Sequence, residues 1–294
     1  MRLVLWCLAL GVLPMPGQVA GIAVYTQFQH QPPTGVVSSL EHEVESILAP
    51  LGFELQWRSL DTVQGNEVSQ QLAVVKFKGT CDPQSFPVDP FRSGGLGWTH
   101  VSDGEILPFM DVDCDHVRGF VRHPLSAAAP AERDVMLGRA LARVVVHELY
   151  HILARTTRHG SGPADHRAYT VQELTDERFE LERGECRIVN ASGAHSPGVR
   201  QGILGWLPGS SKAGQVKFVE KKCSVCHGAR GEGTSRGPVL RVVGHMIDAA
   251  ELATRLGMES RAMCRRADQL KIPQPVLGAS DIHDLVQFLN ASPY

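Results

Sequence analysis

The residues with the clearest capacity for chemistry form the sequence His147-Glu148-Leu149-Tyr150-His151. In a helix, two histidines four positions apart share one face and lie roughly 5–6 Å apart, a spacing that tetrahedral zinc can bridge. Glu148 lies about 100° round the helix from His147, so it cannot be a third ligand in the same plane as the two histidines. It can, however, reach a water that occupies the open coordination position of the metal. The spacing predicts a hydrolytic zinc site with His147 and His151 as ligands and Glu148 as catalytic base.

The surroundings of this motif favour a buried active-site helix over a chance match. Apolar residues surround the motif, whereas a chance match would more often lie on a solvated face. Histidines and a glutamate buried without partners would cost about 1–3 kcal/mol each. The helix is expected to begin at Pro130 and to end near Thr156, where β-branched residues and then glycine and proline follow. The apolar neighbours are Val144, Val145, Val146, Leu149, Ile152 and Leu153.

A third zinc ligand must come from the chain after this helix. A straight helix would carry His159 about 12 Å beyond His151, so His159 can join the metal only if the chain turns back. Glu173 is the alternative, although Thr170-x-x-Glu173 is also a capping box, which would engage that carboxylate with the Thr170 backbone N–H. We expect His159 as the third ligand, with Glu173 as the alternative and His166 behind both.

The HExxH motif followed by a chain reversal and His159 resembles the zincin metallopeptidases, and the strand–helix–strand start of the chain is similar to their metzincin branch. The resemblance implies an α+β zincin-like domain that binds one Zn²⁺ and hydrolyses a peptide or protein substrate. Metzincins carry a glycine at the turn and a third histidine six positions after the second. Here those positions hold Ala154 and Thr157. The other zincin branch takes a glutamate from a second helix, which would be Glu173.

A second chemical motif is Cys223-Ser-Val-Cys226-His227, and Cys-x-x-Cys-His is the attachment signature of haem c. The two thiols can add to the porphyrin vinyl groups, and the adjacent histidine can ligate the iron from one side. A thiol–disulfide exchange motif would follow a strand, whereas a short helix precedes this pair. Zinc would need two further ligands at paired spacing. The motif therefore predicts covalent haem c on Cys223 and Cys226, with His227 as proximal iron ligand.

The segment from this motif to the end of the chain resembles class I cytochromes c, which implies a small all-α domain and a redox partner. Its helices are expected at 249–256 and 280–289. The family usually has Met-Pro before the last helix, where this chain has Ile272-Pro273. Met263 is our first choice for the sixth iron ligand. The alternatives are an open distal position or one of His245, Met246 and Met258.

Composition shifts divide the chain into a signal peptide, two domains and a linker. Residues 1–20 have a charged start, an apolar core and a small-residue cleavage region, which predicts export to the periplasm or secretion. Residues 21–195 form the zincin-like domain, residues 196–214 are rich in glycine, proline and serine and predict a linker, and residues 215–294 form the cytochrome domain. Export permits disulfides, and we expect Cys81 to pair with Cys114.

The remaining patterns describe the first domain. Alternation and composition predict strands at 22–28, 53–57 and 72–77, a helix at 38–48, and extended pieces at 94–101 and 106–110 that could line a cleft. Asp111, Asp113 and Asp115 resemble the start of a calcium loop, but His116 and Arg122 occupy its glycine and glutamate positions, so we reject calcium there.

Composition excludes some functions and leaves two main hypotheses. The 294 residues carry a formal charge of −2 with no dense basic patch, which argues against nucleic-acid binding, and no apolar run after the signal approaches membrane-spanning length. The leading hypothesis is an exported zinc peptidase with an appended haem c domain for electron transfer or sensing. The alternative is a periplasmic electron-transfer cytochrome whose zincin-like domain is a non-catalytic binding module. A redox metal at the histidine site is a third hypothesis.

Overall fold

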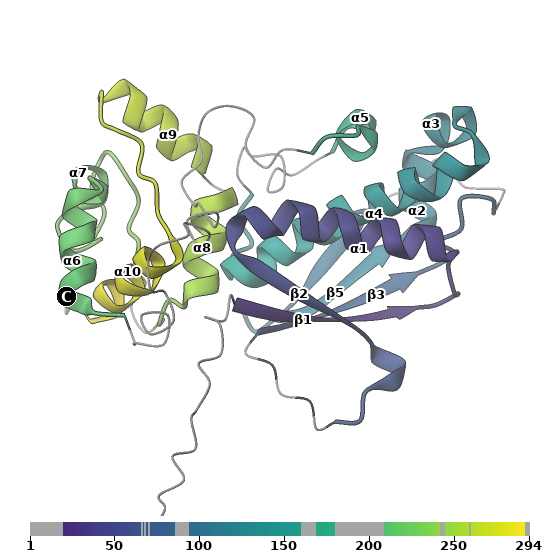
Figure 1. Cartoon of the computed structure of the whole chain (residues 1–294), viewed down its shortest axis with the longest axis horizontal. Coiled ribbons are helices and arrows are strands. Elements are labelled where there is room, and N and C mark those ends of the chain that lie inside the picture. Colours follow the sequence, from purple (N-terminus) through teal and green to yellow (C-terminus); the bar gives the residue numbers. More distant parts are fainter. Residues whose placement is uncertain are drawn as a thin grey trace, which may run out of the picture.

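The structure is a computed structural model, shown in Figure 1. The predicted signal peptide, except Ala20, lies outside the residues that it describes, as do His166 and residues 196–208 of the predicted linker. No helix in the described part of the chain is long and apolar enough to cross a membrane. The described residues are 20–65, 67, 69, 71–85, 94–159, 169–179, 209–241, 245–258 and 260–291.

The N-terminal domain is built on a five-stranded mixed sheet with the strand order β2-β1-β3-β5-β4. Four strands are parallel, and β4 pairs antiparallel with β5 at one edge. The predicted strands and both extended pieces are confirmed, and the extended pieces form the β4–β5 hairpin. The strands are β1 (Ala20–Phe28), β2 (Phe53–Ser59), β3 (Gln71–Lys78), β4 (Gly97–Ser102) and β5 (Glu105–Asp113).

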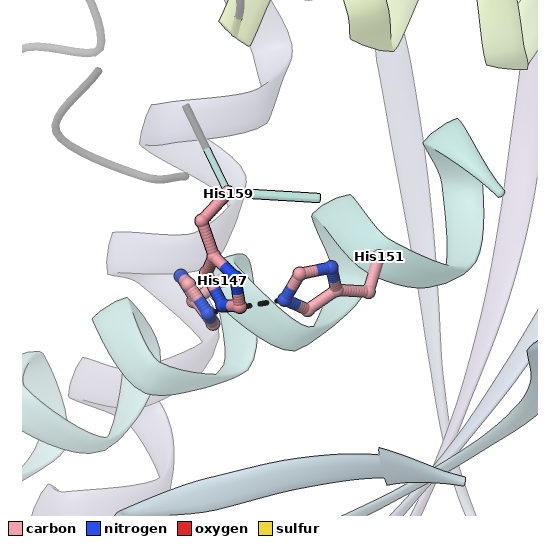
Figure 2. Close-up of side chains that lie close together, drawn as sticks. All are labelled: His147, His151 and His159. Atoms are coloured by element: carbon pink, nitrogen blue, oxygen red, sulfur yellow. Dashed lines mark hydrogen bonds between the residues drawn. The ribbon is translucent and has the colours of Figure 1, made fainter. Parts of the chain in front are cut away.

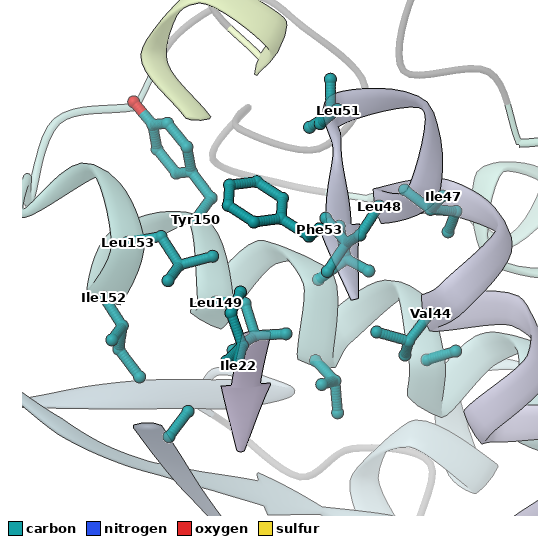
Figure 3. Close-up of a cluster of buried hydrophobic side chains, with 14 of the residues drawn as sticks. Ile22, Val44, Ile47, Leu48, Leu51, Phe53, Leu149, Tyr150, Ile152 and Leu153 are labelled. Carbon is teal, nitrogen blue, oxygen red and sulfur yellow. The ribbon is translucent and has the colours of Figure 1, made fainter. Parts of the chain in front are cut away.

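Two long helices, α1 (Thr34–Leu48) and α4 (Pro130–Ala154), lie side by side over one face of this sheet (Figure 1). Their backbones approach closely at Gly138, where an added Cβ would lie 2.6 Å from the Val36 carbonyl oxygen. Apolar side chains from both helices and from β1 and β2 fill the space between the layers (Figure 3). The α4 helix is therefore packed closely against both the sheet and α1.

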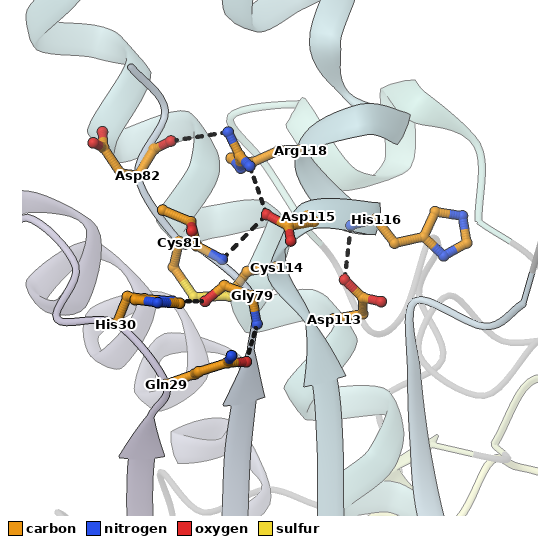
Figure 4. Close-up of a disulfide and its surroundings, with 11 residues drawn as sticks. Gln29, His30, Gly79, Cys81, Asp82, Asp113, Cys114, Asp115, His116 and Arg118 are labelled. Atoms are coloured by element: carbon orange, nitrogen blue, oxygen red, sulfur yellow. Dashed lines mark hydrogen bonds and ion pairs between the residues drawn. A yellow bond between two sulfur atoms is a disulfide. The ribbon is translucent and has the colours of Figure 1, made fainter. Parts of the chain in front are cut away.

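The remaining elements of this domain are short. They are α2 (Cys114–Phe120), α3 (Arg122–Ala127), α5 (Val171–Thr175) and the 3₁₀ helices η1 (Ala49–Leu51) and η2 (Leu60–Thr62). The predicted disulfide between Cys81 and Cys114 is confirmed, and it ties the segment after β3 to the start of α2 (Figure 4).

The aspartates that resemble a calcium loop have other partners. Asp111 contacts Lys78 and His100, and Asp113 caps α2. Asp115 accepts hydrogen bonds from Thr80 and Arg118. Each carboxylate is thus engaged in holding the end of the sheet or the start of α2.

The described elements of the C-terminal domain are all helices, in agreement with the predicted class. Its first helix begins at Ser211, inside the stretch whose composition predicts a linker. Ser210 caps this helix by accepting a hydrogen bond from the Ala213 N–H, and Gly214 packs directly against the last helix. The helices are α6 (Ser211–Glu220), α7 (Cys223–His227), α8 (Ala249–Met258), α9 (Ser260–Gln269) and α10 (Ala279–Ala291).

The two domains touch through α8, which packs against α4 and η1 (Figure 1). Buried residues from both domains belong to one continuous hydrophobic cluster. Gly257 of α8 allows close approach, since a Cβ there would lie 2.3 Å from a methyl carbon of Leu51. The domains are therefore docked against one another in this structure.

Candidate metal centre and haem site

Three histidines converge in the N-terminal domain (Figure 2). His147 and His151 project from successive turns of α4, and His159 approaches from the segment that follows the helix. One ring nitrogen from each lies within 4.8 Å of the others, and the Nε2 atoms of His147 and His151 are 3.2 Å apart. Three imidazole nitrogens at this separation can bind one divalent transition metal.

The chain reversal that His159 requires is present. The helix ends at Ala154, and Arg155 adopts the left-handed conformation with φ of 47°. The N–H groups of Arg155 and Thr156 both donate to the His151 carbonyl, which closes the turn. The hydroxyl of Tyr150 donates to the Arg158 carbonyl at 3.4 Å. Tyr150 is fully buried, so it holds the returning segment from inside the core.

A backbone carbonyl orients His151. Its Nδ1 lies 2.7 Å from the Thr156 carbonyl oxygen, so Nδ1 carries the hydrogen and Nε2 is left free to face the other histidines. Burial lowers the pKa of His151, against the opposing effect of the Thr156 carbonyl, and the neighbouring His159 lowers it further. The neutral imidazole is the form that binds metals.

Glu148 lies beside the cluster and is buried. Burial raises the pKa of Glu148 to about 7, and hydrogen bonds with Thr99 oppose this increase. Thr99 Oγ1 donates to Glu148 Oε2 at 2.7 Å, which fixes the carboxyl group from β4. A cation bound to the histidines would favour the charged carboxylate. The arrangement provides a carboxylate base next to a metal position.

Glu173, the alternative third ligand, does not lie at this centre. Its carboxylate accepts hydrogen bonds from the Thr170 backbone N–H at 2.8 Å and the Thr170 hydroxyl at 2.9 Å, so it completes the capping box of α5. In the part of the chain that the structure describes, the group of metal-ligating side chains here consists of three histidines. The local capping interaction therefore holds Glu173 where it is.

The histidines open into a cavity of about 470 Å³ beneath β4. At its wall β4 approaches α4 closely at Gly97, where a Cβ would lie 2.8 Å from a methyl carbon of Val144. Its other lining residues are largely apolar or aromatic. They include Leu96, Trp98, Val101, Ile106, Phe120 and Tyr169.

Sequence reasoning missed several residues of this site. The sequence does not indicate roles for Thr99, Tyr150 and Tyr169. Thr99 donates a hydrogen bond to Glu148, and the rings of Tyr169 and His147 pack edge to face with centroids 5.8 Å apart. The Tyr169 hydroxyl donates to the Arg143 carbonyl at 3.2 Å, which keeps the ring against α4. The position of Tyr150 inside the motif, on a helix with apolar neighbours, was the one signal available from the sequence.

The haem motif forms α7, with His227 buried at its end. His227 Nδ1 lies 2.8 Å from the Pro238 carbonyl oxygen, so Nδ1 carries the hydrogen and Nε2 is available to iron. The Thr234 hydroxyl donates to the Cys226 carbonyl, and Gly237 lies so close that a Cβ would be 2.9 Å from the same oxygen. The loop after the motif thus holds both the histidine and the cysteine backbone.

The cysteines of this motif do not resemble a thiol–disulfide exchange pair. Burial raises the pKa of the Cys223 thiol to about 11. Exchange motifs instead depend on a lowered thiol pKa. Cys223 and Cys226 lie three positions apart on α7 and neither forms a disulfide, so both sulfurs are available for bonds to the haem.

The candidates for the sixth iron ligand lie in different surroundings. Met263 lies on α9 and is half-buried against the hydrophobic core, whereas Met246 is 69% exposed. His245 Nε2 is engaged with the buried carboxylate of Glu251 at 2.7 Å. The side chain of Met258 lies outside the described residues. Met263 as the sixth ligand stays a prediction.

Comparison with known proteins gives a match for the haem-binding part of the chain. Neither a search of curated proteins nor a search of solved structures found a match to the chain. Residues 211–292 match the family model described as cytochrome c, and this range spans α6 to α10 and both cysteines and the histidine of the haem motif. The C-terminal part of the chain is therefore a cytochrome c domain, which implies covalently bound haem c and suggests electron transfer.

Proposed function

We propose that the chain is an exported zinc-dependent peptidase fused to a haem c domain that transfers electrons or senses a ligand. The observation that carries the proposal is the convergence of three histidine nitrogens within 4.8 Å beside the buried Glu148. This convergence joins residues from a helix and from the returning segment. A helix alone would not bring His159 back.

The donor set suits zinc. Three neutral imidazoles with an open fourth position are the protein ligands of several catalytic zinc sites, and zinc so held supplies Lewis acidity and lowers the pKa of water. The chain supplies the rest. Glu148 accepts the proton of the attacking water and can return it to the leaving amine, while Thr99 holds its carboxylate in the cavity that the histidines also line.

The edge strand favours a peptide as substrate. In the described sheet β4 pairs with β5 on one side and its other side is the sheet edge. An extended peptide could pair with that edge and run across the cavity mouth, with main-chain hydrogen bonds providing affinity. The apolar side chains of Val101, Ile106 and Phe120 favour an apolar residue next to the cleaved bond.

The cytochrome c match favours a second candidate function. Here the haem is the working centre, a redox partner docks on the C-terminal domain, and the N-terminal domain is a non-catalytic binding module. Cytochrome c domains are typically exported, and both candidates place the chain in the periplasm or outside the cell. The two candidates differ in whether the histidine site holds zinc and whether Glu148 is needed for hydrolysis.

Metal content and a Glu148→Gln variant separate the candidates. Protein purified without chelators should contain zinc and iron in about equal amounts. Glu148→Gln should retain zinc and lose hydrolysis of an unfolded protein substrate, because Glu148 acts as base and not as ligand. Metal is measured by elemental analysis and hydrolysis by the release of new amino termini.

His147→Ala provides the matched comparison, because it removes a ligand from the same helix and should lose the zinc while keeping the iron. Iron without zinc in the parent protein would contradict the peptidase proposal. Full hydrolysis by both variants would show that the activity arises elsewhere. Zinc without hydrolysis in the parent would favour the binding module.

A further inference from the structure

Helix α8 of the cytochrome domain contacts the end of α4 through Arg255. Arg255 Nε donates to the Ala154 carbonyl oxygen at 3.2 Å. Ala154 is the last residue of α4, and the final carbonyls of a helix have no partner within the helix. An arginine from the other domain therefore completes the end of the helix that carries His147 and His151, where its positive charge also suits the helix dipole.

A second contact lies one residue further along the turn. Asp248 Oδ2 lies 3.7 Å from Arg155 Nη2 and accepts a hydrogen bond from Gln71 Nε2 at 3.0 Å. Its other oxygen accepts a hydrogen bond from the Glu251 N–H, so Asp248 also caps the start of α8. One carboxylate thus connects the start of α8 to β3 and to the left-handed residue that reverses the chain.

The guanidinium of Arg255 is held firmly from the cytochrome side. Glu251 has a fully buried side chain and lies 2.7 Å from Arg255 Nη2 through one oxygen and 2.7 Å from His245 Nε2 through the other. The contact with His245 is a hydrogen bond, whereas the contact between Arg255 and Glu251 Oε1 is an ion pair without hydrogen-bond geometry. Removing Arg255 would leave a buried carboxylate without its cation, so this ion pair favours a guanidinium held near the end of α4.

These contacts surround the residues that shape the metal centre. Arg155 lies between Ala154, which Arg255 contacts, and Thr156, whose carbonyl orients His151. The same turn returns the chain to His159, which is exposed and whose ring lies against those of His147 and His151, with ring centroids 5.3 and 4.8 Å apart. Any movement of this turn would alter both the tilt of the His151 ring and the position of His159.

We propose that α8 of the cytochrome domain is a positioning element of the metal centre, in which Arg255 and Asp248 hold the turn that orients His151 and delivers His159. This inference rests on the proposed zinc site. It assigns a reason for joining the two domains: the centre binds metal tightly only while the cytochrome domain is folded and docked. Because linkage is reciprocal, metal binding must also stabilise the docked cytochrome domain.

Two substitutions test the contacts separately in the full-length, haem-loaded protein. Arg255→Lys keeps the charge beside Glu251 but loses the planar fork that reaches Ala154. Asp248→Asn keeps a good helix cap and removes the charge that faces Arg155. Arg266→Ala is the control, because Arg266 is an exposed arginine of α9 that contacts Gln269 within its own helix.

The zinc dissociation constant is measured by competition with a chromophoric chelator, and unfolding of the cytochrome domain is followed by haem absorbance with and without zinc. We expect both test variants to raise the dissociation constant about 3- to 10-fold, less than the 10- to 100-fold typical of a group bonded directly to a ligand. The haem spectrum should stay unchanged, and the control should match the parent. Added zinc should raise the unfolding temperature of the parent and raise it less in the variants.

Equal zinc affinity in the parent and both folded variants, with no effect of zinc on haem-domain unfolding, would overturn the inference and leave the peptidase proposal standing. A parent protein that binds no zinc would overturn both. A lower unfolding temperature in the variants without a change in zinc affinity would show that α8 only stabilises the fold, which also contradicts the inference.

Discussion

The three imidazoles of the candidate centre are held in different ways. His147 and His151 are buried on a helix whose apolar neighbours fix them, and His151 has the Thr156 carbonyl as a further constraint. His159 is exposed, and its position depends on the turn after α4. Metal binding should therefore cost more conformational entropy at His159 than at His147 or His151.

This difference leads to a prediction about the third ligand. His159→Ala should weaken zinc binding by orders of magnitude, because two protein ligands remain where three were available. Glu173→Gln should leave zinc affinity nearly unchanged and lower the free energy of unfolding by about 0.5–2 kcal/mol, since it perturbs a helix cap. Zinc titration and denaturant unfolding measure the two effects. The opposite ranking of zinc affinities would assign Glu173 as the ligand.

For individual residues, the sequence predicts contacts between side chains three or four positions apart on a helix. Helix spacing places His147 and His151 on one face, and the Thr170–Glu173 cap follows from a contact three positions apart. Thr99 could not be found in this way, because it meets Glu148 from a strand 49 positions away. The contact between His151 and the Thr156 carbonyl could not be predicted either, because every residue type has a backbone carbonyl.

At the scale of the element, the crossing of α6 and α10 shows how composition can mislead. Glycine and serine before position 215 indicate a linker, but Gly214 lies in a helix and allows α10 to approach, since a Cβ would lie 2.0 Å from the Asp284 carbonyl oxygen. Glycine inside a helix costs about 1 kcal/mol relative to alanine. Close packing, including the rings of Phe218 and Phe288 with centroids 5.3 Å apart, offsets that cost.

A charge cluster at this crossing gives a prediction for acid stability. Lys217 lies 2.6 Å from Asp281 and 2.8 Å from Asp284. Burial alone would raise the pKa of both aspartates, but hydrogen bonds and the charge of Lys217 outweigh it, so both pKa values lie below the ordinary range. A lowered folded-state pKa stabilises the fold above the unfolded-state pKa, and this contribution is lost as pH falls through the folded-state value.

Lys217→Gln should therefore lower the free energy of unfolding of the cytochrome domain by about 1 kcal/mol at neutral pH. Its deficit relative to the parent should shrink as the pH falls below about 4, where the aspartates of the parent also become protonated. Haem absorbance during thermal unfolding at several pH values measures both effects. Lys212→Gln, at the start of the same helix, is the control, and a deficit that stayed constant down to pH 2 would contradict the charge-pair explanation.

At the scale of the whole molecule, sequence patterns separated the chain into two domains but could not show how they meet. The contacts of Arg255 with Ala154 and of Asp248 with Gln71 join residues 101 and 177 positions apart. No local periodicity marks such pairs, because Arg255 and Asp248 would equally suit a solvated helix surface. The sheet and helices of each domain, by contrast, follow from alternation and apolar spacing within short windows.

Docking through α8 leads to a prediction about haem loading. In the parent protein the haem should remain attached after denaturation, because Cys223 and Cys226 bond to it covalently, and alanine at either cysteine should weaken or abolish that retention. Small haem domains depend on the cofactor for their core, so the double alanine variant should lack a folded cytochrome domain. Its α8 would then no longer hold the turn at Arg155. Zinc affinity should fall at least as far as in Arg255→Lys, although both cysteines lie outside the histidine site.

The control for this prediction is Ser224→Ala, which changes a residue between the two cysteines and leaves the attachment signature intact. It should keep both the haem and the parental zinc affinity. A haem-free variant that bound zinc as tightly as the parent would show that the N-terminal domain forms its metal centre alone, and the fusion would then need another explanation. Loss of zinc together with haem would instead mean that the N-terminal domain needs a haem-loaded cytochrome domain to form its metal centre.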